Sequence, residues 1–140
     1  MIEVNYLLVL GLAVFAMALG VLWYGPLFGR AWCKLNGVNP DNPVEVKRMQ
    51  AGMGLVYVIQ FVLTLLMVFV LYVYTKPAVD VVNEVEGALW LWAGLTVPAL
   101  ASAVMWTTES ARQQRKRFLI QAGYFLVLFV VVGVSVMLWG

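Results

Sequence analysis

The distribution of charged residues constrains this chain more than any other feature of its sequence. Charged side chains occur at Glu3 and in three later blocks, which leaves four uncharged stretches: 4–29, 49–75, 87–108 and 118–140. Each stretch holds 22 to 27 residues, and a helix that rises about 1.5 Å per residue needs about 20 residues to cross the hydrocarbon core. The pattern predicts four membrane spans, at about 4–25, 50–75, 86–108 and 118–139.

The composition agrees with this prediction, because 64% of the residues are hydrophobic and 11% are charged, against roughly 45–50% and about 25% in soluble domains. The apolar run from Phe61 to Leu71 lacks the alternation that a membrane β-barrel requires. Short connectors favour neighbouring helices that pack against each other. We therefore predict an all-α, polytopic membrane protein whose residues 1–140 form one domain, with four transmembrane helices in a compact antiparallel bundle.

A cleavable signal peptide is the alternative interpretation of the first span. Ala16-Met17-Ala18 has the spacing of small residues that is found at cleavage sites. However, no Lys or Arg precedes the apolar run, and the run continues past this point to Trp23. These two features favour a retained span.

The basic residues predict the orientation in the membrane. Lys and Arg residues are absent before span one. Four lie between spans one and two, one lies between spans two and three, and four lie between spans three and four. Since basic connectors stay in the cytoplasm, loops 26–49 and 109–117 are expected there, with both termini and the connector from Lys76 to Glu86 outside.

The first connector contains signals for local structure. Pro26 is expected to end or kink span one at the residue before it. Leu27, Ala31 and Leu35 then share one helical face with their aromatic neighbours, so a short interfacial helix is predicted here. Asn42 is placed to cap a following helix, and Glu45 to complete the capping box.

Three features of the spans concern packing. Pro98 is expected to free the carbonyl of Gly94, either as a structural kink or to line a cavity. Small residues recur as Ala16 with Gly20 and as Ala99 with Ala103, which favours close contact with helices of this chain or of a second copy. The segments 11–23 and 94–106 also match at a constant offset of 83, so an internal duplication is one interpretation.

Several classes of function are disfavoured by residues that the sequence lacks. Cys33 is the single cysteine and histidine is absent, so no metal site, no cofactor and no enzymatic activity is predicted. The net charge of +2 gives no reason to expect a nucleic-acid partner. No Asp, Glu, Lys, Arg or His lies within the four uncharged stretches, unlike in the small multidrug exporters, which depend on an embedded glutamate.

Polar and aromatic side chains gather where the spans are predicted to meet the cytoplasm. The candidate ligand-binding residues at this mouth are Trp23, Tyr24, Arg30, Trp32, Trp106, Glu109, Gln121 and Tyr124. Together they could hold a polar headgroup while apolar helix surface accepts a tail. The alternative interpretation is an aromatic belt with snorkelling charges and helix–helix hydrogen bonds.

Two segments carry a family resemblance: 23–32, which reads WYGPLFGRAW, and 118–124, which reads FLIQAGY. In these segments and in the order of its spans, the chain resembles the bacterial domain of unknown function 1761 family. The resemblance implies four helices and a place in the bacterial cytoplasmic (inner) membrane, but no activity.

Two hypotheses about function follow. The first is the binding or transport of a small amphipathic or lipid-like ligand at the cytoplasmic mouth, with membrane lipid as the partner. The second is a non-catalytic scaffold or assembly partner that associates through its small-residue faces, with itself as a homo-oligomer or with another membrane protein.

Overall fold

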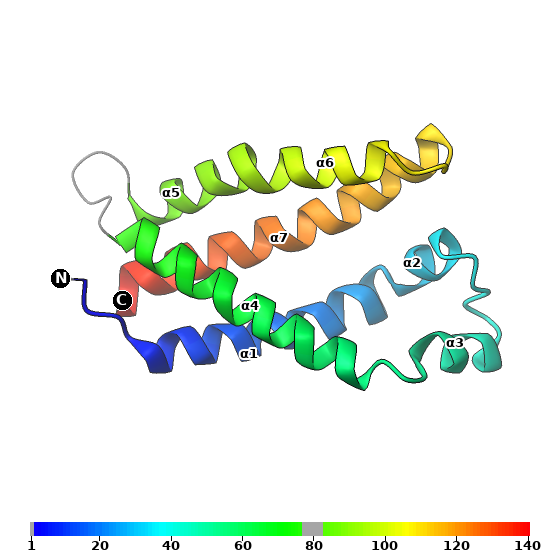
Figure 1. Ribbon diagram of the computed structural model, residues 1–140, viewed down its shortest axis with the longest axis horizontal. Helices are drawn as coiled ribbons and strands as arrows, with labels where there is room; N and C mark the ends of the chain where they lie inside the picture. The colour runs from blue at the N-terminus through cyan, green and yellow to red at the C-terminus, as the bar shows by residue number, and fades with distance from the viewer. Residues whose placement is uncertain (1, 77–82) are drawn as a thin grey trace.

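The computed structural model describes residues 2–76 and 83–140, and all the elements in these ranges are helical (Figure 1). Residues 77–82 of the predicted second connector lie outside the described residues. The elements in chain order are α1 (Tyr6–Leu22), η1 (Trp23–Leu27), α2 (Gly29–Leu35), α3 (Pro43–Gln50), α4 (Gly54–Thr75), α5 (Glu84–Leu91), η3 (Trp92–Thr96), α6 (Val97–Met105) and α7 (Ala111–Trp139). The prediction of an all-α fold is confirmed.

Four helical segments are long and apolar enough to cross a bilayer: Tyr6–Leu27, Gly54–Thr75, Glu84–Met105 and Ala111–Trp139. The first three hold 22 residues each, or about 33 Å at helical rise, which matches the hydrocarbon thickness of about 30 Å. The fourth holds 29 residues. Its first two turns carry all the charge of this helix, and the apolar part begins at Phe118.

Side-chain caps begin several of these helices. The Asn42 side chain accepts a hydrogen bond from the Val44 amide at 3.1 Å, as the sequence predicts. Glu45 does not complete a capping box, because its carboxylate accepts from the amide of Asn39 at 2.7 Å instead. A capping box does begin α7, where Ser110 and Gln113 bond each other's backbone amides.

The second span is separated from the helix that precedes it. α3 ends at Gln50 and α4 begins at Gly54, and between them Gly52 adopts a φ of +73°. Residues with a side chain rarely adopt this left-handed conformation, so the glycine breaks the helix. α3 is therefore a separate, amphipathic helix that precedes the second span in the sequence.

Both predicted proline effects coincide with a widened, π-helical turn. In η1, which contains Pro26, the amide of Phe28 bonds the carbonyl of Trp23 at 2.9 Å. In η3, which directly precedes the first turn of α6 with Pro98, the amide of Val97 bonds the carbonyl of Trp92. A proline removes one amide from the helical ladder, and π turns accommodate such a local defect.

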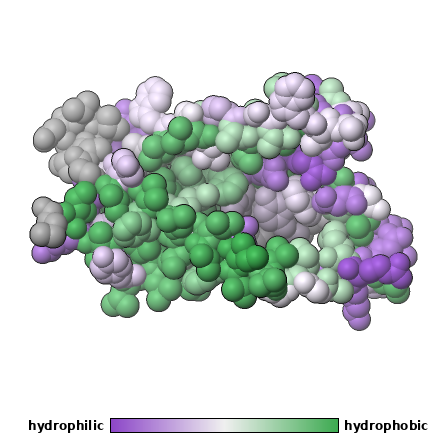
Figure 2. All heavy atoms as spheres, in the orientation of Figure 1, coloured by the Kyte–Doolittle hydropathy of each residue, from purple (hydrophilic) through white to green (hydrophobic). Residues whose placement is uncertain are grey.

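The two ends of the bundle differ in character. At one end, the side-chain amide of Asn5 donates to the carbonyl of Trp139 at 3.3 Å, and the amide of Asn5 donates to the Tyr72 hydroxyl at 3.2 Å. The other end carries α2, α3 and the turn before α7, and Figure 2 shows hydrophilic side chains gathered there. It is called the basic end below.

α7 is the central helix of the bundle, in contact with α1, α4, α5 and α6. About half of its most apolar segment is buried, against 11 to 22% for the other three spans. Its core residues Leu128 and Val132 pack with Val68 and Tyr72 of α4. The outer spans expose broad apolar surfaces, seen over α4 in Figure 2, as expected for helices that face lipid.

Candidate functional site

Two tryptophans attach the π turns to the middle of α7. The indole N–H of Trp23, the first residue of η1, donates to the carbonyl of Ile120 at 2.9 Å. The indole N–H of Trp92, the first residue of η3, donates to the carbonyl of Ala122 at 3.0 Å. Each bond gives a hydrogen-bond acceptor to an indole N–H that would otherwise have no partner in an apolar environment.

An aromatic cluster surrounds these bonds. The rings of Tyr24 and Trp32 lie 4.8 Å apart, and those of Tyr24 and Tyr124 lie 5.9 Å apart. The Tyr124 hydroxyl donates to the carbonyl of Ala16 at 2.7 Å, which joins α7 to α1. A side chain at Gly123 would place its Cβ 3.1 Å from the Trp23 ring, so glycine allows the indole to lie directly on α7.

Arg117 ties the basic end together. Its guanidinium donates to both carboxylate oxygens of Glu109, from Nε and from Nη2. It also donates to the carbonyl of Leu35 at 3.0 Å and to the side-chain oxygen of Asn36 at 3.4 Å. It also lies over the Trp32 ring, 5.1 Å from the ring centroid. The hydrogen bonds from Arg117 lower the pKa of the Glu109 carboxyl below its ordinary value. The Arg117–Glu109 pair thus joins α2 to the start of α7, and each of its two charges is already paired with the other.

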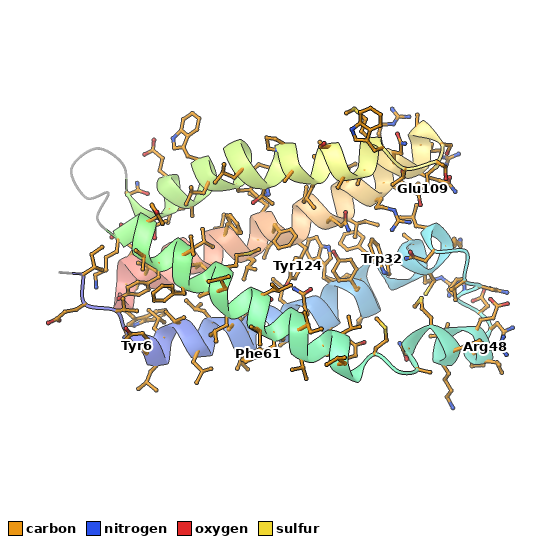
Figure 3. All side chains as sticks on the ribbon, in the orientation of Figure 1. Tyr6, Trp32, Arg48, Phe61, Glu109 and Tyr124 are labelled. Atoms are coloured by element: carbon orange, nitrogen blue, oxygen red, sulfur yellow. The ribbon has the colours of Figure 1, made fainter. Side chains whose placement is uncertain are left out.

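Two of the predicted site residues are not brought into this cluster. Arg30 forms an exposed ion pair with Asp41 at 2.9 Å, within the first connector. Trp106 is 83% exposed at the end of α6. Ring contacts join Trp23, Tyr24, Trp32 and Tyr124, and Arg117 connects Glu109 to Trp32. Figure 3 shows Tyr124 between the helices, Trp32 beside it toward the basic end, and Glu109 at the tip.

The first half of α4 separates from the rest of the bundle. Thr64 and Val68 are 3% and 0% exposed, and a spacing of four residues places Gln60 on the same face. Its amide donates to the Thr64 hydroxyl at 3.2 Å. Yet Gln60 is exposed, and Tyr57, a further turn away, is 52% exposed. The face that is core in the second half of α4 is therefore open in the first half.

An opening toward the aromatic cluster results. Figure 2 shows a recess between the apolar side chains of α4 and those of the upper helices, α5 and α6, with less hydrophobic side chains at its floor. Figure 3 places Tyr124 behind this opening. Val68 shares the core cluster of Tyr124 and Leu128, so helical spacing along α4 places Gln60 and Tyr57 on the side that faces α7. From this spacing we infer an inner cleft between Tyr57 and Gln60 of α4, Trp23 and Tyr24 of η1, and Gln121 and Tyr124 of α7.

Two grooves lie elsewhere on the surface. One, of about 420 Å³, is apolar and lies between α1 and α4, where Tyr6, Leu10 and Phe69 line it. The other, of about 470 Å³, lies between α6 and the start of α7. Within residues 2–76 and 83–140, no group of three His, Cys, Asp or Glu side chains is placed to hold a metal ion.

The two small-residue faces have different surroundings. Ala16 is fully buried, and a Cβ added at Gly20 would lie 3.7 Å from the Tyr124 hydroxyl, so this face packs on α7 of the same chain. Ala99 and Ala103 are exposed on α6. The matched segments 11–23 and 94–106 also differ, because Trp23 donates a hydrogen bond to α7 whereas Trp106 is largely exposed.

A comparison with protein families matches residues 7–137 to the family described as a protein of unknown function, DUF1761. The match covers nearly the whole chain. The chain belongs to the DUF1761 family. The predicted resemblance to this family is therefore confirmed. The Trp23 hydrogen bond to Ile120 joins the two segments, 23–32 and 118–124, on which that prediction was based. Searches of curated proteins and of solved structures find no match.

Three residues of this region were not predicted from the sequence. Arg117 could have been found, because Gln121 and Tyr124 follow it on the same helical face, four and seven residues later. Gln60 is the single amide side chain inside α4, which is also a visible signal. Trp92 has no such signal, since its role depends on which face of span three meets α7.

Proposed function

We propose that this DUF1761 protein binds an amphipathic, lipid-like molecule in the inner cleft, without catalysing a reaction. The observation that carries the proposal is the exposure of Gln60 on the face of α4 that is otherwise core. One N–H of the Gln60 amide bonds the Thr64 hydroxyl, but the second N–H and the carbonyl oxygen have no hydrogen-bond partner among the described residues, and such groups are costly to leave in hydrocarbon. A bound molecule with a polar group would supply that partner.

The chemistry of the cleft indicates a neutral polar group on the ligand. The nearest charged groups, Arg117 and Glu109, neutralise each other. The side chains left to recognise a ligand are the amides of Gln60 and Gln121 and the hydroxyl of Tyr24. These groups donate and accept hydrogen bonds without charge, while the aromatic rings offer apolar contact for the rest of the molecule.

We further propose that the protein lies in the bacterial cytoplasmic membrane, with the basic end in the cytoplasm and both termini outside. The proposal rests on the four Lys or Arg residues in each of the two connectors at this end. The ligand would then enter from the inner leaflet, through the space beside the first half of α4.

Photocrosslinking tests the proposed site. The purified protein in mild detergent is incubated with a monoacylglycerol that carries a diazirine in its acyl chain, and the labelled peptides are identified by mass spectrometry. We expect labels on residues 54–64 and 23–28. Gln60→Leu should reduce this labelling about fivefold, since one hydrogen bond contributes about 1 kcal/mol.

Gln50→Leu is the matched control, because Gln50 is exposed at the end of α3, outside the cleft. Its labelling should equal that of the wild type. Tyr24→Phe and Gln121→Leu are expected to lower labelling as well. Equal labelling around α4 in all variants would show only dissolved lipid and would refute the proposal.

A second candidate function is assembly with another copy, which the exposed Ala99 and Ala103 on α6 favour. Ala103→Leu should then dissociate the complex in detergent, whereas wild-type protein that runs as a monomer would refute it. Gly20 is unsuitable for this test because it contacts Tyr124 of its own chain.

A further inference from the structure

The groove between α6 and the start of α7 combines an apolar wall with a cationic edge. Its volume is about 470 Å³, which lies in the range of small-molecule sites. The apolar wall consists of Ala101, Val104 and Met105 of α6 with Phe118 of α7, and the polar edge consists of Gln114 and Arg115. The groove therefore changes from apolar to cationic along its length.

The Arg115 charge is available to a ligand. The two salt bridges in the described part of the chain are Arg30 with Asp41 and Arg117 with Glu109. Arg115 is exposed and takes part in neither. Glu109, the acidic residue nearest in sequence, is held by Arg117, and the neighbouring Lys116 adds positive charge.

The polar edge is held in place by the turn that joins the two helices. The side-chain amide of Gln114 donates to the carbonyl of Thr107 at 3.1 Å, which fixes the start of α7 against the end of α6. The capping box of Ser110 and Gln113 stabilises the same turn. Arg115 thus extends from a braced helical turn rather than from a free loop.

We propose that this groove binds an anionic phospholipid, with one acyl chain along the apolar wall and the phosphate of its headgroup at Arg115. The apolar wall argues for a lipid rather than a soluble anion, since inorganic phosphate would gain nothing from it. Charge complementarity argues for an anionic headgroup. The site is distinct from the inner cleft, where no unpaired charge was assigned.

The orientation of the protein makes such a ligand abundant. If the basic end lies in the cytoplasm, the groove opens to the inner leaflet, where anionic lipids are enriched. A basic side chain near that surface contributes about 1 kcal/mol to the attraction. This corresponds to about a fivefold preference that depends on the single Arg115 charge.

Native mass spectrometry of the full chain tests the proposal. The protein in mild detergent is mixed with phosphatidylglycerol or with phosphatidylcholine of the same acyl chains, and the bound fractions are compared. We expect the wild type to prefer phosphatidylglycerol. In Arg115→Gln, the ratio of bound phosphatidylglycerol to bound phosphatidylcholine should be about fivefold lower. Arg112→Gln, on the same helical turn but outside the groove, should lose less than twofold.

A second pair of variants tests the apolar wall. Ala101→Leu should fill the groove and reduce binding of phosphatidylglycerol, whereas Ala93→Leu, an equal enlargement at an exposed position outside the groove, should not. Millimolar inorganic phosphate should not displace the lipid. Equal losses in Arg112→Gln and Arg115→Gln, or unchanged binding in Ala101→Leu, would overturn the proposal, and thermal unfolding midpoints identify any variant that fails to fold.

Discussion

The contact between α5 and α7 gives the sharpest quantitative prediction. A Cβ added at Gly133 of α7 would lie 2.9 Å from the Cα of Val85, 3.0 Å from the carbonyl oxygen of Glu84 and 3.3 Å from the Cβ of Ala88. Ordinary contacts between carbon atoms are about 3.5–4.0 Å. Two of the three neighbouring atoms belong to the α5 backbone, so no side chain can rotate away. Gly133→Ala must therefore push α5 outward.

The expected magnitude follows from two opposing terms. Overpacking of a well-packed contact costs about 1–3 kcal/mol. Alanine is favoured over glycine inside a helix by up to about 1 kcal/mol, which offsets part of this cost. We expect Gly133→Ala to lower the free energy of unfolding by about 1–2 kcal/mol.

Gly11→Ala is the matched control, because a Cβ at Gly11 meets no atom within 4 Å. This variant should be neutral or slightly stabilised. Unfolding in mixed micelles of mild detergent and dodecyl sulfate, followed by tryptophan fluorescence, measures the difference. If the two variants differ by about 2 kcal/mol, their ratios of folded to unfolded protein differ about thirtyfold. Equal midpoints would refute the described approach of α5 to Gly133.

Three further predictions concern other parts of the molecule. Trp23→Phe removes one indole hydrogen bond and should lower the free energy of unfolding by about 0.6 kcal/mol, a typical value for membrane helices. Trp106→Phe, at an exposed position, should leave it unchanged. Equal effects of the two variants would contradict the hydrogen bond from Trp23 to Ile120. Because its folded-state pKa is lowered, Glu109 stabilises the α2–α7 contact above the unfolded carboxyl pKa of about 4.3, and this contribution is lost as pH falls through the folded pKa. Fluorescence of Trp32 should report that acid transition, and Glu109→Gln should abolish it. Finally, a cysteine replacing the exposed Lys47, in a Cys33→Ala background, should react with an impermeant maleimide only after the cells are permeabilised, and reaction in intact cells would reverse the proposed orientation.

Part of the candidate site was predicted from the local sequence. Trp23, Tyr24, Trp32, Gln121 and Tyr124 were predicted as one cluster because all lie at the same ends of their spans, and the aromatic contacts join four of them. Arg30 and Trp106 met the same criterion but point elsewhere. Position along the membrane normal follows from the sequence, whereas the direction of a side chain around its helix does not.

The sequence by itself determined the helical class and the presence of four helices long and apolar enough to span a membrane, because charge cannot be left in hydrocarbon and the uncharged stretches have the length of a span. Only the tertiary structure decided that α7 is central, that Trp92 rather than Trp106 bonds it, and that the first half of α4 stands apart. The physical reason is that these helices are apolar on nearly every side, so lipid and protein are equally acceptable neighbours. The choice between them depends on close packing and on hydrogen bonds between residues far apart in the sequence, such as Tyr124 and Ala16, which are 108 positions apart.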